Sequence, residues 1–125
     1  MTIGMMPEPM VEARETTRVF DTGQTSVTAV NEVSLTVPQG EFMAIVGRSG
    51  SGKTTFLNLV AGLDQPTSGQ VYVGGQEVSR FNDAELTQFR RHQVGFVFQS
   101  FGLLPLLSAA ENIELALRIA GAGLR

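Results

Sequence analysis

The segment that most constrains this chain is residues 47–54, which fits the pattern G-x-x-x-x-G-K-[ST] at every fixed position. The glycines allow backbone angles that bulkier residues resist, so N–H groups of the loop can point inward at an anion. A continuous apolar run precedes the loop at 42–46, and a helical pattern follows it at 53–61, with an apolar face formed by Phe56, Leu57, Val60 and Ala61. Because a strand before the loop and a helix after it are the context that phosphate loops require, the sequence predicts a phosphate site rather than a flexible Gly/Ser linker.

Two side chains of this loop have expected chemical roles. Lys53, the single lysine of the chain, would reach the β- and γ-phosphates of a nucleotide, and the Thr54 hydroxyl would ligate Mg²⁺. The helix that follows would direct free N–H groups and the positive end of its dipole at the phosphates. The predicted nucleotide-binding residues of the loop are Gly47, Arg48, Ser49, Gly50, Ser51, Gly52, Lys53, Thr54 and Thr55.

The remaining patterns indicate an α/β fold. Residues 16–37 are typical of two β-strands around a polar turn at 21–24, whereas residues 1–15 lack periodicity and are predicted to be a loose leader. The apolar runs 42–46 and 94–98 are typical of strands buried on both faces of a parallel sheet. Strand and helix patterns alternate from residue 42 onward, which favours such a sheet.

Two capping boxes predict where further helices begin. Asn82 with Glu85 would open a helix that runs through about Arg91, and Ser108 with Glu111 would open another. In each box the first side chain accepts a hydrogen bond from the backbone N–H three residues later, and the glutamate accepts one in return.

Composition excludes several functional classes. The 125 residues carry nine basic and 12 acidic side chains, a net charge of −3, so a nucleic-acid partner is not expected. The absence of cysteine excludes thiolate chemistry and Cys-based zinc sites, and a single histidine, His92, excludes a multi-His metal site within these residues. No apolar run approaches the length of a membrane span, and no secretion signal is apparent, so we expect a soluble, cytoplasmic protein of one domain at most.

Three stretches resemble the ATP-binding subunits of ABC transporters. They are residues 33–42, 58–69 and 90–105, and the third is similar in particular to the branch of lipoprotein-releasing systems and macrolide exporters. The resemblance implies a P-loop NTPase core of the α/β class with an N-terminal antiparallel β part. It also implies a partial nucleotide-binding core at 16–98, followed at 99–125 by a Q-loop and the start of a helical subdomain.

The resemblance assigns roles to two further residues. Gln99 matches the Q-loop glutamine, which in the family meets Mg²⁺ and the attacking water, so Lys53 and Gln99 are the implied catalytic residues, and Thr54 and Gln99 the implied metal ligands. Phe20 matches the A-loop aromatic residue that stacks on adenine, where the family more often has Tyr. Arg48 departs from the family pattern, which usually has Pro at this position.

The family's later motifs do not occur in this sequence: an LSGGQ-like segment, a Walker B strand ending in Asp-Glu, and a switch histidine. The resemblance therefore implies a fragment, truncated before these motifs, that binds Mg-ATP but cannot hydrolyse it alone. Its sheet would lack strands and leave apolar faces uncovered. A short non-hydrolysing nucleotide-binding module and a scaffold fragment with a vestigial ATP loop remain alternatives.

The resemblance also implies partners and a location. In the family, a membrane-spanning permease subunit and a second ATP-binding subunit assemble with such a chain, which would lie in the cytoplasm, peripheral on the inner face of the cell membrane. The apolar segment 101–107 could receive a helix of the permease or pack on the chain's own helices. The sequence leaves these two possibilities open.

Overall fold

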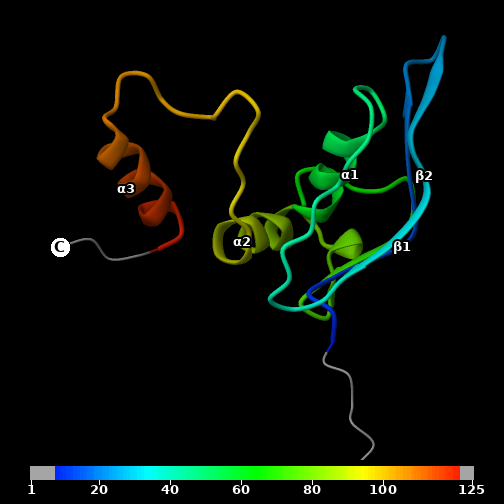
Figure 1. Cartoon of the computed structure of the whole chain (residues 1–125), viewed down its shortest axis with the longest axis horizontal. Helices are drawn as coiled ribbons and strands as arrows, with labels where there is room; N and C mark the ends of the chain where they lie inside the picture. The colour runs from blue at the N-terminus through cyan, green and yellow to red at the C-terminus, as the bar shows by residue number, and fades with distance from the viewer. Residues whose placement is uncertain (1–7, 122–125) are drawn as a thin grey trace, which may run out of the picture.

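The computed structural model describes residues 8–121 and consists of one antiparallel sheet with helices beside it (Figure 1). The strand order is β2-β1-β3-β4. The strands are β1 (Val11–Asp21), β2 (Ser26–Val37), β3 (Ser68–Val73) and β4 (Gln76–Glu77). The helices are α1 (Lys53–Val60), a 3₁₀ turn η1 (Val78–Arg80), α2 (Asp83–Gln93) and α3 (Ala109–Ile119).

The long hairpin of β1 and β2 forms the outer wall of the molecule (Figure 1). At its tip, the Thr22 N–H donates to the Thr25 carbonyl oxygen at 3.0 Å, and the Gly23 N–H donates to the Asp21 carboxylate at 2.8 Å. The predicted polar turn is therefore confirmed. The prediction of a loose leader is wrong for residues 11–15, because β1 begins at Val11 and pairs there with both β2 and β3. Residues 1–7 of that leader lie outside the described residues.

The prediction of a parallel sheet is wrong for the described residues, since all of their strand pairs are antiparallel. Residues 42–46 and 94–98 are apolar enough for buried strands but run as irregular backbone. A strand forms only where a neighbour accepts its hydrogen bonds, and neither segment has a paired neighbour within 8–121. Phe42, Val46 and Val97 are accordingly 98%, 87% and 88% exposed, as expected for uncovered apolar faces.

Two small apolar clusters hold α1, η1 and α2 to the sheet. Phe56 and Leu59 of α1 pack against Ala13 of β1 and Val30 of β2. The second cluster joins β3 to η1 and α2 through Val71, Val73, Val78 and Phe89. The predicted apolar face of α1 is thus correct at Phe56 but not at Leu57, which is 44% exposed, while Leu59 is buried.

Both predicted capping boxes are present. The Glu85 N–H donates to the Asn82 side chain at 2.9 Å, and the Glu111 N–H donates to the Ser108 hydroxyl at 3.1 Å. Helix α3 lies apart from the sheet at the end of a long connection and buries none of its side chains (Figure 1). Across residues 8–121 no helix combines the length and the apolar character needed to cross a membrane.

Candidate functional site

The loop at 47–52 reaches α1 through a glycine whose conformation and surroundings exclude other residues. Gly52 has φ +95°, and a Cβ placed on it would collide with the carbonyl oxygen of Ala29 in β2. The Gly52 carbonyl oxygen accepts the Phe56 N–H at 2.9 Å, the first hydrogen bond of α1. The glycine therefore lets the loop lie directly against β2 while the helix starts.

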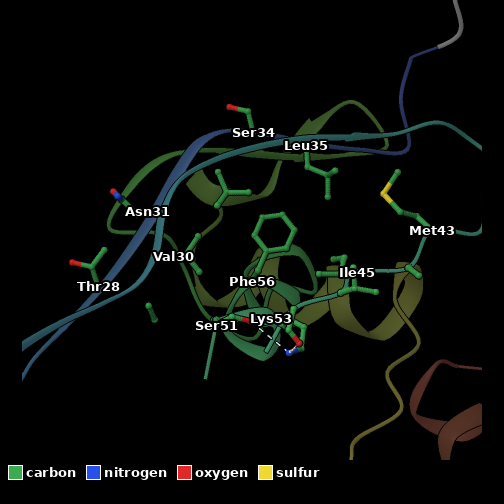
Figure 2. Close-up of a pocket in the computed structure, with 16 residues that line it drawn as sticks. Thr28, Val30, Asn31, Ser34, Leu35, Met43, Ile45, Ser51, Lys53 and Phe56 are labelled. Atoms are coloured by element: carbon green, nitrogen blue, oxygen red, sulfur yellow. Dashed lines mark hydrogen bonds between the residues drawn. The ribbon is translucent and has the colours of Figure 1, made fainter. Parts of the chain in front are cut away.

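The side chain of Lys53 folds back over the loop (Figure 2). Its ammonium donates to the carbonyl oxygens of Gly47 and, at 2.8 Å, of Arg48. The Ser51 hydroxyl lies 3.5 Å from the same nitrogen, and the Ser51 N–H donates to the Arg48 carbonyl oxygen at 3.1 Å. A single positive charge is thus held at the centre of the loop by neutral acceptors, with no carboxylate among them, so it can still attract an anion.

The N-terminus of α1 is open to an anion. Gly52 has no side chain to cap the helix, and the first turn of α1 contains no acidic residue. The first N–H groups of a helix have no partner within the helix, and together with the dipole they create a partial positive charge. This charge adds to that of Lys53 at the same end of the helix.

A pocket of about 480 Å³ lies at this helix end. Its lining includes seven of the predicted site residues: Ser49, Gly50, Gly52, Lys53, Thr54, Thr55 and Gln99. Gln99 comes from a loop 45 residues downstream of Thr54, so the chain brings the two implied metal ligands to one cavity. Val27, Thr28 and Ala29 of β2 form the rest of the pocket lining. No sequence motif predicted that these three residues would belong to the site.

The other predicted residues lie outside the lining of this pocket. Gly47 and Ser51 instead line a larger hollow of about 580 Å³, which shares Gly52 and Lys53 with this pocket (Figure 2). There Phe56 points from α1 toward β2, with Val30, Leu35 and Ile45 around it (Figure 2). Because this hollow is lined mainly by apolar side chains, the pocket beside Gln99 suits an anion better. Arg48 lines neither, and contributes its carbonyl oxygen to Lys53.

Phe20 lies near the tip of β1, directly opposite Val27, which lines the pocket. Phe20 is 40% exposed and does not itself line the pocket. The guanidinium carbon of Arg18 lies 4.4 Å from the ring centroid. Arg18 was not predicted to belong to the site, although its position two residues before the aromatic, on the same face of a strand, was visible in the sequence.

Comparison with known proteins identifies the family. The sequence profile described as ABC transporter matches residues 30–123. The chain belongs to the ABC transporter family. This assignment, together with the fold, confirms the resemblance that the phosphate loop and the segments around it indicated.

The chain is similar to relatives of the branch expected from residues 90–105. It is 45% identical over 119 residues to the macrolide export ATP-binding/permease protein MacB of Hyphomonas neptunium, covering 95% of this chain and 18% of MacB. It is 46% identical over 112 residues to the lipoprotein-releasing system ATP-binding protein LolD of Geobacter metallireducens, covering 90% of this chain and 50% of LolD. The chain therefore spans half or less of the length of these curated relatives.

A solved structure agrees with the fold. The dimeric ATP-binding cassette MJ0796, in a post-hydrolysis state bound to ADP and Pi, superimposes with a TM-score of 0.86 at 43% identity. The superposition covers 93% of this chain and 50% of that cassette chain. The α/β fold class, an ABC ATPase core with an N-terminal antiparallel β part, is confirmed.

Proposed function

We propose that the chain is an ATP-binding part of an ABC-type ATPase and that it binds Mg-ATP in the pocket beside Gln99. The observation that carries this proposal is that one cavity collects Lys53, the start of α1, Thr54 and Gln99. These groups provide a cation, free N–H donors, a hydroxyl and an amide oxygen, which suit phosphates and a hard divalent ion.

Each group has a separate task in the proposed site. Lys53 and the first turn of α1 would bind the phosphates, and the backbone of Gly47, Arg48 and Ser51 would keep the Lys53 ammonium in place. Thr54 and Gln99 would hold Mg²⁺, which when bound neutralises charge on the phosphates. Phe20 would stack on the adenine ring near the β1–β2 tip, because Phe offers an aromatic face as Tyr does.

Hydrolysis needs a group that positions or activates the attacking water. Among the described residues that line the pocket, none is Asp, Glu or His. We infer that this chain binds Mg-ATP but by itself releases phosphate no faster than the background reaction. A second ATP-binding subunit and residues beyond these 125 would complete the site, which is consistent with the dimeric state of the similar cassette.

The proposed partner is a membrane-spanning permease, which would place the chain at the inner, cytoplasmic face of the cell membrane. The names of MacB and LolD, which describe macrolide export and lipoprotein release, support a role in transport. The segment 101–107 supports such a contact, since Phe101, Leu103 and Leu106 are 72%, 65% and 97% exposed rather than packed on the chain's own helices. An exposed apolar run of this kind suits a protein interface.

Titration of the chain with Mg-ATP by calorimetry tests the proposal. Binding should be saturable, and Lys53→Ala should weaken it by about tenfold to a hundredfold, because a charge-assisted hydrogen bond to phosphate is lost. A scaffold fragment with a vestigial loop would instead show no heat of binding and no rise in melting temperature. Steady phosphate release that disappears in Lys53→Ala would contradict the inferred lack of hydrolysis.

A further inference from the structure

An arginine holds the aromatic ring at the edge of the proposed nucleotide site. The Arg18 guanidinium lies over the Phe20 ring, 4.4 Å from its centroid, while its Nε donates to the Asp64 carboxylate at 2.8 Å. The Arg18 and Asp64 side chains are only 26% and 31% exposed. A planar guanidinium suits both contacts at once, since it can stack on a ring and bind a carboxylate at its edge.

Asp64 belongs to the segment that leaves α1, and this segment is fastened to β1 beside Phe20. The Thr67 N–H donates to the Thr17 carbonyl oxygen at 2.8 Å, and the Val19 N–H donates to the Thr67 hydroxyl at 2.9 Å. At the other end, the Asp64 N–H donates to the Asn58 carbonyl oxygen in α1 at 3.2 Å. A continuous set of contacts thus runs from the helix that begins at the phosphate loop to the strand that carries Phe20.

A second arginine on the same strand makes similar contacts, but its carboxylate partner lies on its own strand. Arg14 lies over the Tyr72 ring, 4.5 Å from its centroid, and donates to Glu12 at 2.8 Å. Glu12 is two residues away on β1 itself, and none of these three residues lines the pocket beside Gln99. The contrast indicates that the Arg18–Asp64 pair does more than shield an aromatic ring, because its carboxylate comes from the segment that leaves α1.

We propose that Arg18 and Asp64 are positioning residues that fix the Phe20 ring for stacking on a purine base. This inference rests on the proposed function, and it concerns the base rather than the phosphates. A ring already held in one orientation loses little freedom when a base stacks on it, so binding is favoured by preorganisation. Phe20 remains 40% exposed as a residue although the guanidinium lies over its ring, which leaves surface for the base.

The experiment compares two probes, Mg-ATP and inorganic tripolyphosphate with Mg²⁺, on the same variants. Arg18→Ala and Asp64→Asn should each weaken Mg-ATP binding by about threefold to tenfold. In these variants the Phe20 side chain is free before binding, so stacking on the base must immobilise it. Tripolyphosphate, which has no base, should bind as it does to the unaltered chain. Arg14→Ala is the matched control and should change neither affinity. Arg18→Lys, which keeps a cation able to reach both partners, should restore part of the ATP affinity.

A double-mutant cycle separates positioning from general loss of structure. Phe20→Ala should lose the same base-dependent affinity, and adding Arg18→Ala to it should cause no further loss, since the ring that Arg18 holds is gone. Equal weakening of ATP and tripolyphosphate in Arg18→Ala, or full additivity in the cycle, would overturn the inference while leaving the proposed function intact. If the unaltered chain binds neither probe, the proposed function itself is wrong and this inference fails with it.

Discussion

Arg90 on α2 donates from Nη1 to the carbonyl oxygen of Gly62, 2.7 Å away, at the C-terminal end of α1. Gly62 has φ +73°, and a Cβ on it would lie 2.9 Å from the ring of Phe89, so α2 packs closely against this helix end. A cation at a helix C-terminus interacts favourably with the dipole and satisfies a carbonyl that has no partner in the helix. The helix that begins at the phosphate loop is therefore anchored at its other end by α2.

Arg90→Ala should lower the free energy of unfolding by about 1–2 kcal/mol, because a partly buried carbonyl oxygen loses a charged donor. Urea titration followed by circular dichroism measures this change. Arg80→Ala is the control, since that side chain is 82% exposed and its nitrogen lies 3.7 Å from the Glu77 carboxylate. Its substitution should cost less than about 0.5 kcal/mol. Equal losses in the two variants would contradict a specific role for Arg90.

Gly52→Ala should be among the most damaging single-methyl additions in the chain. Alanine would have to keep φ near +95° and would also meet the Ala29 carbonyl oxygen. Gly23→Ala provides the matched comparison, because Gly23 has φ +85° but no atom within 4 Å of the added Cβ. We expect Gly23→Ala to cost about 1–2 kcal/mol from backbone strain alone and Gly52→Ala at least twice as much.

Thermal unfolding of both glycine variants distinguishes strain from collision. If Gly52→Ala melts at the same temperature as Gly23→Ala, the loop can move away from β2, and its contact with Ala29 does not fix its position. If it melts far lower or fails to accumulate, the contact with Ala29 sets the position of the loop.

Lys53→Arg should weaken Mg-ATP binding almost as much as Lys53→Ala. The Lys53 ammonium fits between carbonyl oxygens of the loop as a compact charge, whereas a guanidinium is a wide planar fork. Arg48→Pro should leave affinity within a few fold, because the site uses the carbonyl oxygen of residue 48 and not its side chain. Calorimetric titration in which Lys53→Arg binds normally would show that charge alone matters at this position.

The parts of the fold that local hydrogen bonds decide could be predicted from sequence. The capping boxes of Asn82 and Ser108 each depend on side chains three residues apart, so their motifs predicted the helix starts. The runs 42–46 and 94–98 could not be predicted reliably, because an apolar run becomes a strand only if another strand pairs with it. That condition depends on residues far away in the chain.

The candidate site also contains some residues that the sequence predicts and some contacts that it does not predict. The loop and the start of α1 follow from a contiguous motif, and Gln99 from a family resemblance, so both were expected near phosphate. Gly52 lies against Ala29 of β2, 23 positions earlier in the chain. Arg18 pairs with Asp64, which is 46 positions later. Contacts at such separations are set by how α1 packs on the sheet, and no local pattern in the sequence predicts them.

The first turn of α3 should loosen in acid. Hydrogen bonds from the backbone N–H and side chain of Ser108 lower the pKa of Glu111 below its ordinary value of 4.5. Because the pKa is lower in the folded chain, this contribution to stability is present above pH 4.5 and is lost as the pH falls through the lowered pKa. The amide proton shift of Ser108, followed by NMR from pH 7 to pH 2, should report this titration.

Glu111→Gln provides the direct comparison for this titration. The amide oxygen still accepts a hydrogen bond but does not titrate, so the Ser108 shift should stay nearly constant over the same range. Glu114→Gln, on the same helix but outside the capping box, should leave the titration unchanged. A Ser108 shift that moves equally in Glu111→Gln would mean that another group causes it.

The chain should self-associate at tens of micromolar through its uncovered apolar segments. Phe42 and Val46 are 98% and 87% exposed on backbone that pairs with no strand among the described residues, and such surfaces readily pair with other chains. Light scattering should detect species larger than the monomer, and Phe42→Glu with Val46→Glu should reduce them. Gln24→Glu adds negative charge at the exposed β1–β2 turn and should have little effect. A monodisperse monomer before any substitution would contradict the prediction, and equal improvement by Gln24→Glu would attribute association to low net charge rather than to these apolar side chains.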